Sequence, residues 1–296
     1  MKRAGAQWMF FSMMAFSAIH RPALARAEEV VAILSSEVAA YREAYEGFQD
    51  ALGRRVPAAL LSREEPEIGP ETRVVVAFGG KAALRHYPSR VTVVYCMAPG
   101  TKLAPQEFGP SVVEIQMLPR AEVILSKIKE IQPSLKRLAV FWSSKPLESD
   151  LRELQRASAK AGIEILSEQL GDPKDLPERL RALYTKIDAV WLTPDPILVT
   201  LRNFSILKEF SWSNAIPFYV PIAGLVEQGA TASVSADFRE IGRTAAMAVK
   251  QVLADKRIQG TFYPMQAEVV LHPRMAQWLG LEIVQNPPEE RKKGLP

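Results

Sequence analysis

Val30-Val31-Ala32-Ile33-Leu34-Ser35-Ser36 is a run of five apolar residues that ends in two serines. An apolar run without polar alternation is typical of a parallel strand that is covered on both faces. The next apolar residues recur at helical spacing and lead to a glycine suited to a helix end, in the order Tyr41, Tyr45, Phe48, Leu52 and Gly53. The segment therefore predicts a buried strand that leads into a helix.

The same order of strand and helix repeats along the chain. Apolar runs predict further strands over 73–78, 91–95, 138–142, 163–166, 189–193, 217–220 and 265–271. Helical spacing, or a proline suited to a first helical turn, predicts helices over 81–86, 121–131, 147–161, 176–184, 197–214, 241–252 and 273–279. This alternation with short connections predicts an α/β fold with parallel sheets. Because one series of units precedes Pro119 and a second follows it, we expect two sheets rather than one.

Residues 1–27 have the features of a secretory signal. Lys2 and Arg3 precede an apolar run over 8–19, and Ala25-Arg26-Ala27 offers small residues at a cleavage site. The apolar run is too short to span a bilayer stably. We therefore expect export to the periplasm with cleavage after Ala27, and the alternative is a retained membrane anchor.

Cleavage would also remove the excess of basic residues. The chain has 37 lysines and arginines against 33 acidic residues, and four of the basic residues lie in the segment 1–27: Lys2, Arg3, Arg21 and Arg26. The 33 basic residues that remain balance the 33 acidic ones, so a nucleic-acid partner, which needs a clustered positive surface, is not expected. The charged, proline-rich segment 286–296 is expected to be a disordered tail.

Residue types that carry catalysis are few. Cys96 is the single cysteine, so no internal disulfide can form, and its apolar neighbours indicate a packed small hydrophobe. After residue 27 the only histidines are His86 and His272, which lack metal-ligand spacing. No nucleophile elbow and no phosphate-binding loop is present in the sequence. We therefore expect no enzyme activity, no metal and no cofactor, with an exported hydrolase as the minor alternative.

Small polar residues gather at the ends of the predicted strands. Ligands of open parallel sheets bind beyond the carboxyl ends of the strands, where helix N-termini favour anionic groups. The candidate ligand-binding residues at or near these ends are Ser35, Ser36, Tyr41, Gly79, Gly80, Lys81, Met97, Ser143, Ser144, Asp195 and Pro221. For each serine the alternative role is helix capping.

Three charged positions allow two interpretations each. Asp195, held between two prolines in Thr193-Pro194-Asp195-Pro196, either pairs with a ligand ammonium or caps the helix that starts near Ile197. Lys81 either faces an anionic ligand group or points to solvent. Asp237, with Glu240 three residues later, fits a helix-capping box better than a ligand site.

Six segments of the chain follow one another in a recognisable order. They are Val31-Ala32-Ile33-Leu34, Tyr45-Glu46-Gly47-Phe48-Gln49-Asp50-Ala51-Leu52-Gly53, Ile216-Pro217-Phe218-Tyr219-Val220, Val226-Glu227-Gln228-Gly229-Ala230-Thr231-Ala232-Ser233-Val234-Ser235-Ala236-Asp237, Ile241-Gly242-Arg243-Thr244-Ala245-Ala246 and Ala276-Gln277-Trp278-Leu279-Gly280-Leu281. Together they resemble the ABC-transporter substrate-binding proteins of the tryptophan/tyrosine-binding-like group. The resemblance covers nearly all of the chain after residue 27.

The resemblance implies a type I periplasmic binding fold, in which two Rossmann-like lobes are joined by crossing hinge strands and close on a solute. The expected lobes are residues 28–117 with 234–263, and residues 118–233 with 264–285. The expected crossings lie near 112–117, 232–235 and 262–266. The implied function is capture of a small organic solute, for example an amino-acid-like one, for an ABC permease of the inner membrane. The alternative function is that of a solute sensor that docks on a membrane receptor. We also expect a monomer.

Three places depart from the usual pattern of that family. The loop after the third strand reads Gly79-Gly80-Lys81-Ala82 where the family has glycine, then threonine or serine, then proline. The fourth strand is followed by Met97-Ala98-Pro99-Gly100 in place of an aspartate-proline element. The segment 62–72 contains Pro66 and Pro70 and leaves little room for the helix expected there.

Overall fold

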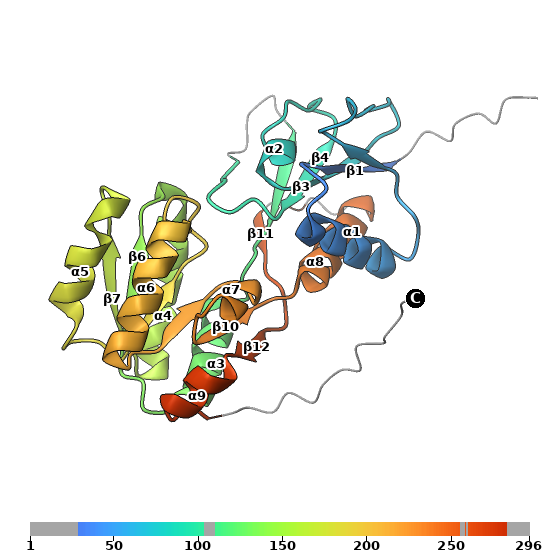
Figure 1. Ribbon diagram of the computed structural model, residues 1–296. Helices are drawn as coiled ribbons and strands as arrows, with labels where there is room; N and C mark the ends of the chain where they lie inside the picture. Colours follow the sequence, from blue (N-terminus) through green and yellow to red (C-terminus); the bar gives the residue numbers. More distant parts are fainter. Residues whose placement is uncertain (1–28, 104–109, 255–257, 259, 283–296) are drawn as a thin grey trace, which may run out of the picture.

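The computed structural model describes residues 29–103, 110–254, 258 and 260–282. The chain forms two lobes, each with one sheet and with helices on both sheet faces (Figure 1). The predicted α/β class, with two lobes joined by crossing segments, is confirmed. The predicted secretory signal 1–27, its cleavage site and the expected tail 286–296 lie outside the described residues.

The first lobe contains a sheet of six strands in the order β11-β5-β4-β3-β1-β2, all parallel. Its elements are β1 (Val30–Leu34), α1 (Ala39–Leu52), β2 (Ala58–Leu60), β3 (Val74–Phe78), α2 (Gly80–Ala83), β4 (Thr92–Cys96), β5 (Ser111–Ile115), α8 (Phe238–Leu253) and β11 (Gly260–Phe262). Most of the lobe therefore comes from the N-terminal part of the chain. A helix and an edge strand from the C-terminal part complete it.

Both faces of the first sheet are buried, as the unbroken apolar run of β1 predicted. Ala32 and Phe78 face α1 and α8, whereas Ile33 and Ala77 pack on the opposite face with the residues around α2. Cys96 lies in the first of these clusters with no exposed surface, and burial raises the pKa of its thiol. The interpretation of Cys96 as a packed small hydrophobe is confirmed.

The second lobe contains a sheet of six strands in the order β12-β10-β9-β8-β6-β7, in which only β12 is antiparallel to its neighbour. Its strands are β6 (Arg137–Trp142), β7 (Glu164–Gln169), β8 (Ala189–Leu192), β9 (Phe218–Val220), β10 (Ala232–Ser235) and β12 (Glu268–Leu271). Its helices are α3 (Ala121–Ile131), α4 (Glu148–Ala161), α5 (Leu176–Leu183), α6 (Leu201–Asn214), α7 (Gly224–Glu227) and α9 (Pro273–Trp278), with short 3₁₀ turns η1 (Lys145–Leu147) and η2 (Pro173–Asp175). One buried cluster lies under α3, α4 and α9 and the other under α5, α6 and α7.

Three segments connect the two sheets. The chain crosses from β5 to α3 over residues 116–120, returns from β10 to α8 over 236–237, and crosses again from β11 to β12 over 263–267. β10 pairs only within the second sheet, so the return follows Ser235. Figure 1 shows these segments between the lobes.

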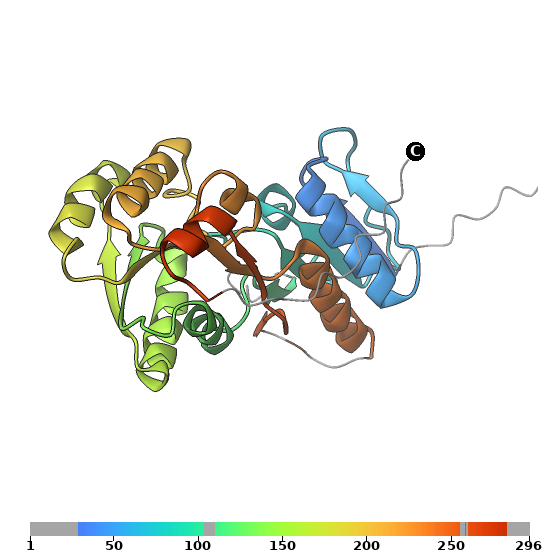
Figure 2. The same cartoon turned by 60° about the horizontal axis from the view of Figure 1, so that its bottom comes forward.

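Helices α1 and α8 lie side by side, as both views show (Figures 1 and 2). Their backbones touch at two glycines, since a Cβ at Gly47 would overlap the carbonyl oxygen of Arg239 and one at Gly242 would overlap that of Ala44. Asp237 begins α8 by accepting a hydrogen bond from the Glu240 N–H at 2.6 Å. The helix-capping interpretation of Asp237 is therefore confirmed.

Several element bounds differ from the sequence predictions. The helix expected over 81–86 is the single turn α2, and the helix expected from 197 begins at Leu201, because Thr200 caps its first turn through Asn203. The strand expected over 265–271 starts at Glu268, after the crossing segment. The segment 62–72 holds turns and no helix, as its prolines predicted. No helix within the described residues is both long and apolar enough to cross a membrane.

Candidate functional site

A cleft lies between the two lobes, at the carboxyl ends of β4, β5 and β8. Its walls are the loop over 98–102, the crossing 116–119, the start of α4 with the 3₁₀ turn before it, and residues 191–194. It holds about 890 Å³ of space, including its open mouth. This is the place where open parallel sheets bind ligands.

Three aromatic side chains line the cleft. Tyr95 comes from β4 in the first lobe, Trp191 from β8 in the second lobe, and Tyr263 from the crossing after β11. Trp191 is 5% exposed, so only a small part of its surface faces the cleft. The Arg120 guanidinium lies 4.5 Å from the centre of the Tyr263 ring, a cation–π contact. Tyr95 is also buried, whereas Tyr263 is half-buried, so Tyr263 is the ring of these three that offers a solute the most surface.

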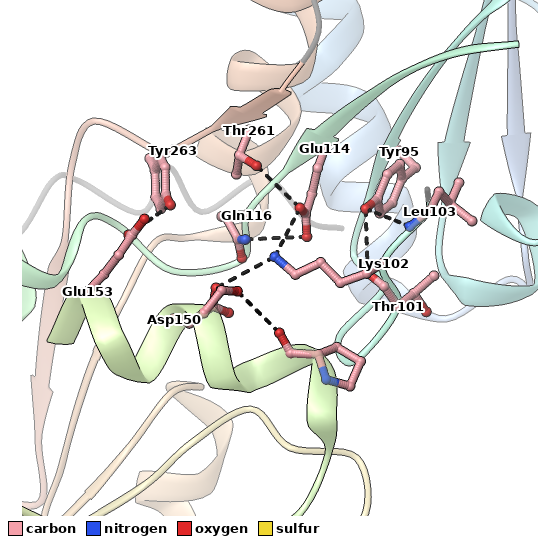
Figure 3. A network of polar contacts seen from close by, with 12 residues as sticks. Tyr95, Thr101, Lys102, Leu103, Glu114, Gln116, Asp150, Glu153, Thr261 and Tyr263 are labelled. Carbon is pink, nitrogen blue, oxygen red and sulfur yellow. Dashed lines mark hydrogen bonds and ion pairs between the residues drawn. The ribbon is translucent and has the colours of Figure 1, made fainter. Parts of the chain in front are cut away.

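Charged side chains from both lobes meet in the cleft (Figure 3). Lys102 Nζ lies 3.2 Å from Glu114 Oε2 in its own lobe and 3.6 Å from Asp150 Oδ1 in the other. Two neutral groups also donate to Glu114, namely the Gln116 amide at 3.3 Å and the Thr261 hydroxyl at 3.3 Å. A single ammonium therefore bridges the lobes between two carboxylates.

A second polar contact crosses the cleft beside the first (Figure 3). The Tyr263 hydroxyl donates to Glu153 Oε2 on α4 at 2.9 Å. Burial raises the pKa of Tyr263 above its ordinary value, and the nearby Glu153 carboxylate raises it further. Tyr263 is therefore a neutral donor at physiological pH.

The electrostatic character of the cleft is acidic. Its described lining includes three carboxylates, Glu114, Asp150 and Glu153, and one lysine, Lys102. Burial raises the pKa of Glu114 and of Asp150 above ordinary values, although the Lys102 ammonium acts in the opposite direction on both. Burial therefore outweighs the lysine, and Glu114 and Asp150 each hold a proton to a higher pH than an exposed carboxyl group does.

In the first lobe, four of the predicted site residues lie together at the ends of β1 and β3. Ser35 Oγ accepts a hydrogen bond from the Ala82 N–H at 2.9 Å and so caps α2. Gly79 has φ 96°, and a Cβ there would lie 2.6 Å from Ser35 Oγ and 2.7 Å from the Tyr41 ring. Gly80 follows as the first residue of α2. Ser35 therefore bonds the first turn of α2, and it is not the cap of the helix that follows it in sequence, since the N-cap residue of α1 is Val38.

The other candidates of the first lobe lie around this group. Ser36 is half-buried and Lys81 is exposed, so the structure agrees with the solvent-facing interpretation of Lys81. Met97 is buried in the lobe core with φ 56°, a backbone conformation that is uncommon for residues other than glycine.

In the second lobe, Asp195 brings Ser143 and Ser144 together. Asp195 Oδ2 accepts from the N–H of Ser143 at 2.6 Å and of Ser144 at 2.8 Å, and Oδ1 accepts from Ser144 Oγ at 2.6 Å and from the Ile197 N–H at 2.9 Å. The residue is 0% exposed. These contacts fill the carboxylate from within the lobe. The helix expected near Ile197 begins at Leu201 with Thr200 as its cap, so Asp195 holds the turn over 196–198 and is not the cap of that helix. Pro221, the last candidate, is buried after β9.

The residues that line the cleft are neighbours of the predicted ones. Ala98 follows Met97, Pro194 precedes Asp195, and Pro146 lies two positions after Ser144. Sequence reasoning missed the charged residues Lys102, Glu114 and Asp150. One signal was available, because Glu114 is a lone acid inside the apolar strand β5. Within the described ranges, no group of three or more histidine, cysteine or acidic side chains is arranged to hold a metal ion.

Comparison with known proteins gives both a family and a fold. The sequence profile described as "ABC transporter substrate binding protein" matches residues 110–284. No curated protein matches the chain.

Among solved structures, a ligand-free, open substrate-binding protein with adhesive properties from Clostridium difficile matches with a TM-score of 0.61 and 16% identity, over 88% of this chain and 97% of that one. A conserved domain protein from Vibrio cholerae matches with a TM-score of 0.59 and 20% identity, over 88% of this chain and 97% of that one. An ABC domain in complex with L-Trp from Streptococcus pneumonia matches with a TM-score of 0.57 and 17% identity, over 86% and 95%. At these identities the structures establish the type I periplasmic binding fold alone.

Proposed function

The chain belongs to the ABC transporter substrate binding protein family, and from this premise we propose that it captures a small organic solute in the interlobe cleft and delivers it to an ABC permease of the inner membrane. The family and the fold support a solute-binding role. The observation that carries the proposal is the cleft itself, which is lined by both lobes at the carboxyl ends of their strands.

An amino-acid-like compound is one candidate solute. The related Streptococcus domain was solved with L-Trp, and this chain offers aromatic rings and carboxylates in its own cleft. Two of the departures adjoin the cleft wall, because Ala98 follows Met97 and a Cβ at Gly80 would lie 3.6 Å from Thr101 Oγ1. We propose that the two lobes, which meet at the three crossings, close on the solute as rigid bodies.

We also propose that the protein is exported to the periplasm, is cleaved after Ala27 and is a monomer. These proposals rest on the sequence of residues 1–27 and on family membership. The second candidate function keeps the same binding event but ends in a membrane receptor instead of a permease, since fold does not decide between delivery and sensing.

A thermal-shift screen of the mature protein against amines, amino acids, small carboxylates and aromatic compounds tests the binding step. A solute at 100 times its dissociation constant adds about 2.7 kcal/mol to the free energy of unfolding. A screen in which no compound raises the unfolding temperature would contradict the proposal.

Deletion of the gene separates delivery from sensing. Delivery predicts that the deletion strain loses uptake of the solute at low concentration. Sensing predicts normal uptake with a lost cellular response to the solute. Genes for a permease and an ATPase next to this one would favour delivery, and a kinase or cyclase gene would favour sensing.

A further inference from the structure

Lys102 lines the cleft and forms ion pairs with carboxylates of both lobes. Its side chain is 36% exposed, and its ammonium lies between a carboxylate of each lobe, Glu114 at 3.2 Å and Asp150 at 3.6 Å. Figure 3 shows the side chain extending from the loop after β4 toward both carboxylates. The position of Lys102 Nζ is therefore a site for a positive charge, and a carboxylate from each lobe contacts it.

Of the two carboxylates that contact Lys102, Glu114 is the more buried and accepts hydrogen bonds from two neutral groups. Its side chain is 15% exposed, and the Gln116 amide and the Thr261 hydroxyl hold its two oxygens at 3.3 Å each. Asp150 is held in turn by the Ser149 hydroxyl at 3.1 Å. The two carboxylates are thus oriented by neutral donors, and the single cation between them comes from a flexible side chain.

The surroundings favour a cation over an anion at this place. The described lining has three carboxylates and one lysine, and the nearby Arg120 guanidinium lies on the ring of Tyr263, so the Lys102 ammonium is the cation that faces Glu114 and Asp150. An anionic solute held by Lys102 would lie beside Glu114 and Asp150, and it would be repelled by both. The half-buried ring of Tyr263 lines the same cleft and can contact an apolar or aromatic body next to the charge.

We propose that Lys102 is an internal occupant of a cation-binding site, and that the solute is an organic amine whose ammonium replaces Lys102 Nζ between Glu114 and Asp150. The inference rests on the proposed function, since it uses the same cleft. Displacement costs little, because a partly exposed lysine regains hydration when its ion pairs break. The lysine then acts as a competitor that lowers the apparent affinity for the solute.

Titration calorimetry with three probes tests the inference. The probes are 2-phenylethylamine, the neutral 2-phenylethanol and the anionic 3-phenylpropanoate. If Lys102 occupies the site about nine-tenths of the time, the amine finds it open about one-tenth of the time, and its apparent affinity is about tenfold lower than for a site without the lysine. Lys102→Met should therefore bind 2-phenylethylamine about tenfold more tightly than the wild type and should leave 2-phenylethanol unchanged.

Two further variants control the experiment. Lys127→Met removes a lysine that pairs with Glu130 on the surface of α3, away from the cleft, and should leave the affinity for the amine at the wild-type value. Glu114→Gln keeps the size of the side chain and removes its charge, so in the Lys102→Met protein it should weaken amine binding about tenfold.

The inference is overturned if Lys102→Met binds 2-phenylethylamine no more tightly than the wild type does. It is also overturned if the wild type binds 3-phenylpropanoate more tightly than the amine and Lys102→Met loses that binding. Absence of amine binding by both proteins is the third result that overturns it. The failure of the proposed function looks different. If the thermal-shift screen finds a neutral or anionic solute, the protein still binds a solute and only this inference fails. If the screen finds none, the proposed function fails as well.

Discussion

The buried carboxylate of Asp195 joins two loops of the second lobe. Its two oxygens accept four hydrogen bonds, three from Ser143 and Ser144 after β6 and one from Ile197 after β8. Burial by itself would raise the pKa of Asp195, but the hydrogen bonds from Ser144, Ser143 and Ile197 outweigh it and hold the pKa below its ordinary value. The loops that border the cleft on this side are therefore fixed in place by one charged residue.

Asp195→Asn should destabilise the protein at pH 7 by about 2–3 kcal/mol, because the amide NH₂ would face N–H or O–H groups that now donate to an oxygen. Chemical denaturation of both proteins measures the difference. The variant should still bind the solute with nearly unchanged affinity. A large loss of affinity without loss of stability would restore Asp195 as a ligand contact.

The stability difference between wild type and Asp195→Asn should depend on pH. Because the folded-state pKa of Asp195 is lowered, its contribution is fully present above the unfolded-state value of about 3.9 and is lost as pH falls through the folded-state value. Denaturation curves at pH 7 and below pH 4 should show the two stabilities converging at the lower pH. A difference that is constant over this range would argue against an ionised carboxylate in this role.

At the residue scale, the sequence predicted positions better than roles. It placed Ser35, Ser144 and Asp195 correctly at strand ends, but a serine or aspartate there can cap a helix or face a ligand, and only the contacts decide. The Lys102 bridge was not predictable, because its partners Glu114 and Asp150 come from different lobes. Such contacts depend on how the lobes are placed, which local patterns do not encode.

The contact between α1 and α8 joins distant parts of the chain in the first lobe. Both helices lie on one face of the sheet, and Gly47 and Gly242 let their backbones meet (Figure 2). The two glycines therefore fix the spacing at which α8, from the C-terminal part of the chain, docks on the lobe.

Gly242→Ala should destabilise the protein by about 2–3 kcal/mol, since the new methyl group would overlap the Ala44 carbonyl and push the helices apart. Gly224→Ala is the matched control, because a Cβ at the start of α7 would meet no atom within 4 Å. Thermal unfolding of the two variants should show a clear loss for the first and none for the second. Equal unfolding temperatures would mean that the helices can separate without cost.

At the element scale, the sequence predicted the buried strands and long helices well. β1 and α3 were predicted with the bounds that the structure shows, because strand burial on both faces and helical spacing are strong local signals. The short edge strand β2, which is partly exposed, gave no comparable signal. The antiparallel direction of β12 follows from the crossing before it and not from its own residues.

The whole molecule consists of two lobes with three connecting segments (Figure 1). Two contacts cross the cleft near these segments, the Lys102–Asp150 ion pair and the Tyr263–Glu153 hydrogen bond. A fold of this kind changes shape by rotation of whole lobes, which leaves the two cores intact.

Solute binding should therefore reduce the radius of gyration measured by small-angle X-ray scattering. The expected cause is rigid-body closure about the crossings at 116–120, 236–237 and 263–267. Scattering from the protein at saturating solute, compared with the protein alone, gives the result. An unchanged radius at saturation would contradict closure.

Calorimetric titration of Pro146→Trp beside Lys145→Trp shows whether the solute binds between the lobes. The two residues are adjacent in the turn before α4, but only Pro146 lines the cleft. With the solute identified by the screen, Pro146→Trp should bind at least about tenfold more weakly, a change of about 1.4 kcal/mol, and Lys145→Trp should bind like the wild type. Equal dissociation constants for both variants and the wild type would show that the solute binds elsewhere.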